Sequence, residues 1–316
     1  MTMSGGRSVL VTGGTGHVGA CLCRRLLTGG DRVAVLSRPG ADRSRLSGVD
    51  GIAILNGSLT EARSVAAAVD AAAPDVVFHL AGTPFNPPTH SLADHVQVNV
   101  NGAANLVAAL QGTPARVVYT SSAAIYGPGP ALREDRLLAP GTWVGAVKAA
   151  AGMILEANAR MSGGTLTELR LFTPFGPMER PGRLVPSVIL AALDGRPVRT
   201  TAGLQRRDFV FIDDVVDALM RAGGRTQPGV LIANIGSGTG VSVREMVSLI
   251  LRLMGDPVPA EFGALPSRPD EIPEITADIS AAFRLLGWRP QTDLETGVAQ
   301  TIAWFRTHAE FARRLT

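Results

Sequence analysis

The single lysine of the chain is the first residue whose type indicates chemistry. Lysine and arginine together number 30, and Lys148, in the stretch TWVGAVK (residues 142–148), is the one lysine among them. An ammonium group is a compact charge with three rotatable donors, whereas a guanidinium group is a rigid planar fork. A chain that otherwise uses arginine keeps a lysine here, which indicates a site with a specific need for an ammonium group.

A second chemical pattern is the glycine-rich stretch TGGTGHVG near the N-terminus. Its glycines recur every third residue, directly after an apolar run that predicts a strand and before a helical pattern. Glycines at such a junction allow a tight turn and the close approach of a pyrophosphate to the helix N-terminus. We therefore predict a dinucleotide site that includes Gly13, Thr15, Gly16, His17, Val18 and Gly19.

The end of the second predicted strand, LSRPG, indicates which dinucleotide binds. An acidic residue at this point would hydrogen-bond the ribose hydroxyls of NAD. The chain instead has Ser37 and Arg38, with Arg43 and Arg45 nearby, and a hydroxyl beside a guanidinium suits a 2′-phosphate. NADP(H) is the favoured cofactor, and the alternative is that Arg38 is a solvated loop residue.

Strands and helices that alternate along the chain must position these residues. Helical patterns span residues 17–30, 61–73, 91–112 and 142–161, and strand patterns span 7–14, 32–38, 51–57, 75–82, 115–122 and 165–172. Such alternation predicts an α/β fold with a doubly wound parallel sheet of the Rossmann type. Beyond Phe172, prolines and glycines become frequent and the elements shorter. We expect a nucleotide-binding domain over residues 1–172, to which segments near 208–235 return, and a smaller α/β substrate-binding domain over 173–316.

Composition limits the classes of partner. The net charge is only +3 and no basic run with interleaved aromatic residues occurs, so we expect no nucleic-acid partner. Cys21 and Cys23 have neither zinc-cluster nor redox spacing and predict free thiols, and no metal site is expected. No leader pattern and no run of eighteen apolar residues occurs, so we expect no membrane partner and a cytoplasmic location.

Further motifs follow along the chain in a characteristic order. They are HLAG at 79–82, VNVNG at 98–102, SSAAIYG at 121–127, LRLFTPFG at 169–176, QRRDFVFIDDV at 205–215, NIGSG at 234–238 and ADIS at 277–280. With these motifs the chain resembles the extended short-chain dehydrogenases/reductases, the family of UDP-galactose 4-epimerases, dTDP-glucose 4,6-dehydratases and nucleotide-sugar ketoreductases. The resemblance covers nearly the whole length.

The resemblance implies roles for individual residues around the cofactor. Cofactor contacts are implied for Ser58, Leu59, Leu80, Ala81, Gly82, Asn99, Lys148 and Phe172, and His79 is expected to be structural. Ser58 departs from the family, which usually has an aspartate there. Ser122 matches the catalytic serine that hydrogen-bonds the reacting oxygen, and Lys148 matches the catalytic lysine that binds the nicotinamide ribose.

The catalytic tyrosine of the family is absent. The family pattern is Tyr-x-x-x-Lys, and Val144 stands four residues before Lys148, with Trp143 beside it. The chain holds only two tyrosines, Tyr119 and Tyr126, and neither replaces the missing phenol in sequence. A valine cannot exchange protons, so the usual general acid and base is missing.

The resemblance also implies a nucleotide-diphosphate sugar as substrate. Contacts to it are implied for Thr83, Ser122, Thr173, Leu184, Thr200, Arg207, Arg268 and Glu271, with the two arginines on the diphosphate. In this family the two long helices near 91–111 and 142–161 pair across a two-fold axis, so a homodimer with a four-helix interface is expected.

The missing tyrosine and the NADP-type Ser37–Arg38 pair together predict a direction of chemistry. Epimerases and dehydratases must first deprotonate an alcohol, to which a positioned base contributes ~10²–10⁴-fold, whereas a ketoreductase needs only a proton afterwards. We therefore expect an NADPH-dependent 4-ketoreductase acting on a nucleotide-linked keto-deoxysugar, most plausibly a dTDP-4-keto-6-deoxyhexose. The alternatives are a nucleotide-sugar epimerase or 4,6-dehydratase with an unusual acid/base, or a catalytically silent nucleotide-binding relative.

Overall fold

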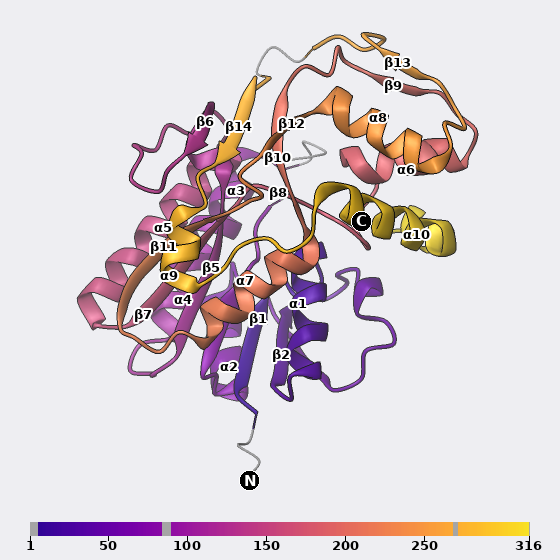
Figure 1. Cartoon of the computed structure of the whole chain (residues 1–316). Helices are drawn as coiled ribbons and strands as arrows, with labels where there is room; N and C mark the ends of the chain where they lie inside the picture. The colour runs from indigo at the N-terminus through magenta and orange to yellow at the C-terminus, as the bar shows by residue number, and fades with distance from the viewer. Residues whose placement is uncertain (1–5, 84–89, 268–270, 316) are drawn as a thin grey trace.

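A computed structural model describes residues 6–83, 90–267 and 271–315 of the chain. Its main layer is a seven-stranded sheet in the order β11-β7-β5-β4-β1-β2-β3, in which every pair is parallel (Figure 1). The strands are β1 (Ser8–Thr12), β2 (Arg32–Ser37), β3 (Ile52–Asn56), β4 (Val76–His79), β5 (Arg116–Ser122), β7 (Thr165–Leu171) and β11 (Gly229–Ile235). The predicted doubly wound parallel sheet is confirmed.

Helices cover both faces of this sheet, as the nearly unbroken apolar runs of its strands require. One face carries α1 (His17–Thr28), α7 (Ile212–Gly224) and α9 (Ser280–Leu286), and the other carries α2 (Ala62–Ala72), α4 (Gly102–Ala109) and α5 (Trp143–Ser162) (Figure 1). The strand order reverses between β1 and β4. In open α/β sheets, ligands bind outside the carboxyl ends of the strands at such a switch point.

The second half of the chain builds smaller layers beside this end of the sheet. A mixed sheet joins β6 (Gly129–Leu132), β8 (Thr173–Phe175), β10 (Arg206–Phe211), β12 (Gly240–Ser242) and β14 (Glu274–Ala277), and a ribbon joins β9 (Val198–Thr200) to β13 (Ala260–Phe262). Helices α6 (Leu184–Leu193), α8 (Val243–Met254) and α10 (Leu294–Arg313) pack into a separate apolar core. Two short helical turns are η1 (Ser44–Leu46) and η3 (Ala123–Ile125). The division at residues 172 and 173 remains a prediction, while β11 lies in the main sheet.

The helix predicted over 91–112 differs from expectation. It consists of α3 (Leu92–His95), a wider π-helical turn η2 (Val96–Asn101) and α4. The wider turn accommodates the buried Asn99, whose side-chain amide donates a 2.9 Å hydrogen bond to the backbone oxygen of His95. Such π-turns often occur at functional sites.

Among the described residues, no helix is both long and apolar enough to cross a membrane. Cys21 and Cys23 are free cysteines, and burial raises the pKa of each thiol to about 12.

Candidate functional site

The glycine turn after β1 has the geometry that a dinucleotide needs. Gly13 has φ 74°, and a Cβ on it would lie 2.6 Å from the backbone nitrogen of Ala81. A Cβ on Gly19 would lie 2.2 Å from the backbone oxygen of Gly13, so helix α1 approaches the turn too closely for any side chain. Gly16 caps α1, whose unsatisfied N–H groups and positive dipole end favour a phosphate. The residues present therefore fit a dinucleotide pyrophosphate.

A cleft of about 850 Å³ lies at this switch point. Of the residues predicted for the cofactor, it is lined by Gly13, Thr15, Gly16, His17, Val18, Ser37, Arg38, Ser58, Leu59, Leu80, Ala81 and Gly82, and also by Thr83 from the substrate set. These residues come from four separate segments, and the fold brings them together. Gly19, Asn99, Ser122, Lys148 and Phe172 are not among the residues that line it.

Lys148, on helix α5, lies behind Gly82 at the inner end of the cleft. Its ammonium donates hydrogen bonds to the backbone oxygens of Thr120 (2.9 Å) and Ala81 (3.4 Å), at the ends of two neighbouring strands. A Cβ on Gly82 would lie 3.0 Å from Lys148 Nζ, so this glycine leaves space for the ammonium. Burial lowers the pKa of Lys148 to about 8, against the opposing field of Glu168. The ammonium is thus buried and fixed beside Gly82, which lines the cleft.

Asn99, Thr83 and His95 form a buried polar cluster beside this lysine. A Cβ on Gly82 would also lie 2.8 Å from Asn99 Oδ1, which puts Asn99 and Lys148 over the same glycine. Asn99 Nδ2 donates to Thr83 Oγ1 (2.9 Å), and Thr83 Oγ1 is hydrogen-bonded to His95 Nδ1. The sequence predicted Asn99 and Thr83 but missed His95, which gives no motif because a lone histidine in a helical pattern is usually a packing residue.

Ser122 lies at the end of β5 and caps the turn η3. Its Oγ accepts a hydrogen bond from the backbone nitrogen of Ala124 (3.2 Å), and its side chain is half-buried. That bond does not use the hydroxyl proton, so Ser122 can still donate to a ligand. The N-terminus of α5 packs tightly on the same turn, since a Cβ on Gly145 would lie 2.3 Å from the backbone oxygen of Ala124.

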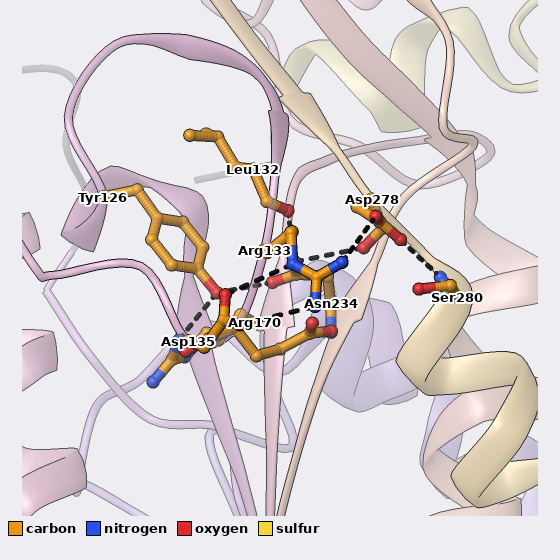
Figure 2. A network of polar contacts seen from close by, with 9 residues as sticks. Tyr126, Leu132, Arg133, Asp135, Arg170, Asn234, Asp278 and Ser280 are labelled. Carbon is orange, nitrogen blue, oxygen red and sulfur yellow. Dashed lines mark hydrogen bonds and ion pairs between the residues drawn. The ribbon is translucent and has the colours of Figure 1, made fainter.

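Tyr126 is fully buried in a polar network that Figure 2 shows from close by. Its hydroxyl donates to Asn234 Oδ1 (2.8 Å) and accepts from Arg170 NH1 (2.7 Å). Arg170 also pairs with Glu168, and both side chains are buried. Burial raises the pKa of Tyr126 to about 12, although Arg170 opposes the rise. Tyr126 is therefore a structural phenol and does not exchange protons in the cleft.

Tyr119 is excluded in the same way. Its hydroxyl donates to the backbone oxygen of Lys148 (3.0 Å), and its side chain is fully buried. Burial raises its pKa well above 10. Its ring stacks on His79, whose Nδ1 is hydrogen-bonded to Thr12 Oγ1 (2.7 Å). Burial lowers the pKa of His79 to about 3, so this histidine stays neutral inside the sheet, as its expected structural role requires.

The outer end of the cleft is more open. Arg38 is exposed, while Ser37 is buried and its Oγ accepts a 3.3 Å hydrogen bond from Arg43. Arg43 also reaches Asn56 Oδ1 (2.6 Å) at the end of β3. Ser58 is bonded to its neighbours, with its Oγ 2.8 Å from Thr60 Oγ1.

A loop from the second half of the chain closes over the glycine turn. His17 Nε2 is 2.9 Å from the backbone oxygen of Pro177, and Arg45 donates to the backbone oxygen of Met178 (2.9 Å). Glu179 pairs with Arg183 (3.2 Å), and burial raises the pKa of Glu179 to about 7. Glu179, Arg180 and Arg183 also line the cleft. The sequence missed these three, because an irregular loop has no periodicity to mark it.

The remaining predicted residues within the described ranges are not among those that line the cleft. Arg207 forms an ion pair with Glu271, and both are half-buried, so the structure brings these two predictions together. Thr200 is buried, and its hydroxyl donates to the backbone oxygen of Thr201 (2.9 Å). The others are Thr173 and Leu184, which are half-buried, and Phe172, which is buried against Tyr126. Arg268 lies outside the described residues.

Comparison with known proteins places the chain in a family. The model of the NAD dependent epimerase/dehydratase family matches residues 9–236. UDP-glucuronate 4-epimerase 1 of Arabidopsis thaliana is 31% identical over 96% of this chain and 78% of its own length. UDP-glucose 4-epimerase of Mycolicibacterium smegmatis is 31% identical over 95% of this chain and 99% of its own. The solved structure of MoeE5 in complex with UDP-glucose and NAD superimposes with a TM-score of 0.86, 31% identity and coverage of 96% and 99%.

The predicted ketoreductase activity is wrong. The similar proteins are 4-epimerases of UDP-glucuronate, UDP-glucose and dTDP-L-rhamnose, which supports the epimerase alternative instead. The MoeE5 structures with UDP-glucose and with UDP-glucuronic acid both hold NAD, so a nicotinamide dinucleotide is supported but NADP is not singled out. The chain belongs to the NAD-dependent epimerase/dehydratase family.

Proposed function

We propose that the protein is a nucleotide-sugar 4-epimerase. The observation that carries the proposal is the cleft at the switch point, with the buried ammonium of Lys148 fixed at its inner end. That site lies in a chain that aligns from end to end with 4-epimerases. A sugar hydroxyl must lose a proton and its carbon a hydride, and the site needs groups for both.

The chain's own residues would divide this work. A bound nicotinamide would supply the acceptor and the donor of the hydride. Lys148 would bind the ribose of the cofactor and hold positive charge near the reacting oxygen. Ser122 would donate its free hydroxyl proton in a hydrogen bond to that oxygen, which matters most while negative charge develops there.

The substrate would be a nucleoside diphosphate sugar. Arg207 and Glu271 form a half-buried pair in the second half of the chain, and a guanidinium suits the oxygens of a diphosphate. The neighbouring MoeE5 structures hold UDP-glucose and UDP-glucuronic acid. We therefore propose a UDP-sugar first and a dTDP-sugar second, with the diphosphate near Arg207.

The finer cofactor choice is proposed as NADP(H). Its support is the absence of an acidic side chain at the end of β2, where Ser37 and the exposed Arg38 line the cleft. A homodimer is also proposed, because α3 and α5 expose the large apolar side chains of Leu92, Trp143, Met153 and Met161. Sedimentation as a monomer at micromolar concentration would contradict the homodimer.

The test of the activity uses three candidate substrates. UDP-glucuronic acid, UDP-glucose and dTDP-L-rhamnose are each incubated with the protein and the oxidised cofactor, and the sugar C4 configuration is followed by NMR. We expect one of them to interconvert with its C4 epimer without solvent deuterium entering C4, because the same hydride returns. The Lys148→Met variant is the control for contaminating activity. No epimer from any of the three would overturn the proposal in favour of a silent relative.

A further inference from the structure

We propose that Thr83 and His95 form a proton relay that takes the place of the missing tyrosine. The proposal rests on the epimerase function proposed above. Thr83 would be the residue that contacts the reacting hydroxyl, and His95 would act through it. Three observations support the proposal: the position of Thr83, the hydrogen bonds of its hydroxyl, and the groups around His95.

Thr83 lies where the cleft meets the buried cluster. It lines the cleft, and it directly follows Gly82, over which the ammonium of Lys148 lies. The relay therefore starts beside the fixed positive charge, where an ionising sugar hydroxyl would be stabilised. Val144 is half-buried one residue after Trp143, and the Trp143 ring meets the His95 ring edge-on at 6.2 Å. His95 thus lies beside the start of α5, where the family places its tyrosine.

The hydrogen bonds of Thr83 give the relay a direction. Asn99 Nδ2 donates its two protons in hydrogen bonds to Thr83 Oγ1 and to the backbone oxygen of His95, both at 2.9 Å. Since an amide nitrogen only donates, Thr83 Oγ1 must accept from Asn99. The hydroxyl proton of Thr83 is then available for His95 Nδ1, provided that the neutral imidazole carries its proton on Nε2. The second lone pair of Thr83 Oγ1 remains for a proton from the ligand.

The transfer balances without a further reactant. The sugar hydroxyl gives its proton to Thr83 Oγ1 while Thr83 passes its own proton to His95 Nδ1, and the carbon gives its hydride to the nicotinamide. The O–H and C–H bonds of the sugar break, a C=O bond forms, and His95 becomes an imidazolium. When the hydride returns to the other face, His95 gives a proton back to Thr83, and Thr83 gives one to the sugar oxygen.

The surroundings of His95 keep it ready to accept a proton. Burial lowers its pKa below 6.5, His90 lowers it further with its ring 6.0 Å away, and Asp94 on the same helix opposes the shift. Among the described residues, Lys148 on α5 lies beside Asn99 over Gly82, and Asn99 on η2 contacts the cluster directly. These surroundings favour the neutral imidazole, which can act as a base.

The activity test compares matched variants. We expect His95→Gln and Thr83→Val to lower kcat by ~10²–10⁴-fold, the usual contribution of a positioned acid or base, with cofactor affinity unchanged. Thr83→Ser keeps the hydroxyl and should stay within about tenfold of the parent, well inside that loss. His308→Gln, on the exposed end of α10, is the control histidine change. Unchanged kcat in His95→Gln would overturn the relay.

The pH profile separates the relay from mere packing. In the parent protein kcat should fall as the pH drops through the pKa of His95, below 6.5, because the imidazolium cannot accept a proton. This acid limb should disappear from the residual activity of His95→Gln and persist in His308→Gln. An identical acid limb in His95→Gln would contradict a role for His95 in proton transfer.

A readout without turnover tests the same contact. In protein labelled with ¹⁵N-histidine, NMR should show His95 as the Nε2–H tautomer with Nδ1 accepting a hydrogen bond, and Thr83→Val should shift Nδ1 selectively among the five histidines. An Nδ1–H tautomer, or no shift in Thr83→Val, would overturn the relay. This measurement also holds if the parent epimerises none of the sugars, so failure of the relay and failure of the function are distinguished.

Discussion

The two ends of the cleft hold their side chains in opposite ways. At the inner end Lys148, Asn99 and Thr83 are buried and bonded to one another or to strand-end carbonyls. At the outer end Arg38 is exposed, and Ser37 is held by Arg43 from a loop. Buried charges interact strongly and weaken little with salt, whereas exposed ones are screened. Changes at the inner end should therefore abolish chemistry, and changes at the outer end should adjust affinity.

The largest effect is expected from Lys148→Met. Loss of the ammonium should lower turnover by roughly 10³–10⁴-fold, since Lys148 is the cation that the described residues place next to Gly82. Steady-state epimerisation assays measure this. Arg160→Met is the matched control, because it removes from the same helix an exposed charge that forms an ion pair with Glu156. Turnover that survives Lys148→Met would remove the inner end from the chemistry.

The next effect is expected from Ser122→Ala. Turnover should fall by roughly 10²–10³-fold, the cost of losing one donor to a developing oxyanion, while cofactor affinity stays the same. Ser122→Thr keeps the hydroxyl and should recover most of the rate. Because Ser122 also caps η3, a loss of about 1 kcal/mol of stability is expected in Ser122→Ala and must be measured alongside. Weaker cofactor binding with unchanged turnover would contradict this division of roles.

The sequence predicts some parts of the molecule and misses others, depending on whether they carry a local pattern. The glycine turn, the order of strands and helices and the lysine at the inner end all carry strong local patterns, and the main sheet agrees with them. Strands of three residues such as β8, β9 and β12 are too short to show a period of two, so the second sheet was not predicted. The spacing before Lys148 revealed the missing tyrosine.

His95 could not be predicted because its contact is tertiary. His95 lies in a helix, twelve residues after Thr83, which follows the end of a strand. The π-helical turn that orients Asn99 toward both residues has no sequence signature. The loop with Glu179 and Arg183 was missed for a similar reason, since only the fold brings it against His17. The activity was predicted wrongly because the prediction rested on the missing phenol and on the Ser37–Arg38 pair, whereas the similar proteins are 4-epimerases.

A smaller effect is expected on the free energy of unfolding, because burial of the Lys148 ammonium destabilises the folded protein. A lowering of the Lys148 pKa from 10.5 to about 8 corresponds to about 3 kcal/mol of destabilisation at neutral pH. After the loss of its hydrogen bonds is counted, Lys148→Met should raise the free energy of unfolding by about 1–2 kcal/mol at pH 7. Urea unfolding of the cofactor-free proteins measures this.

The difference in free energy of unfolding between Lys148→Met and the parent protein should change with pH. Between pH 8 and 10.5 the unfolded state holds more protons on Lys148 than the folded state, so the parent protein gains stability as the pH rises through this window. The advantage of Lys148→Met should therefore shrink toward pH 10.5. A difference that is constant over this range would show that the ammonium is not destabilised by burial.

The smallest effect is expected at the outer end, from Arg38→Asp. The parent should bind NADP⁺ about tenfold more tightly than NAD⁺, corresponding to ~1.4 kcal/mol from an exposed guanidinium on a 2′-phosphate. Arg38→Asp should reverse the order, and Arg38→Leu should erase the preference without reversing it.

Because Arg38 is exposed, the preference for NADP⁺ should decline between 50 mM and 500 mM salt, as the Debye length shortens to below ~8 Å. The effect of Lys148→Met on turnover should not decline with salt. Calorimetric titration with both dinucleotides at two salt concentrations measures all of these. A parent protein that prefers NAD⁺ would make Arg38 a solvated loop residue, and a preference that resists salt would show that the outer end is held as tightly as the inner one.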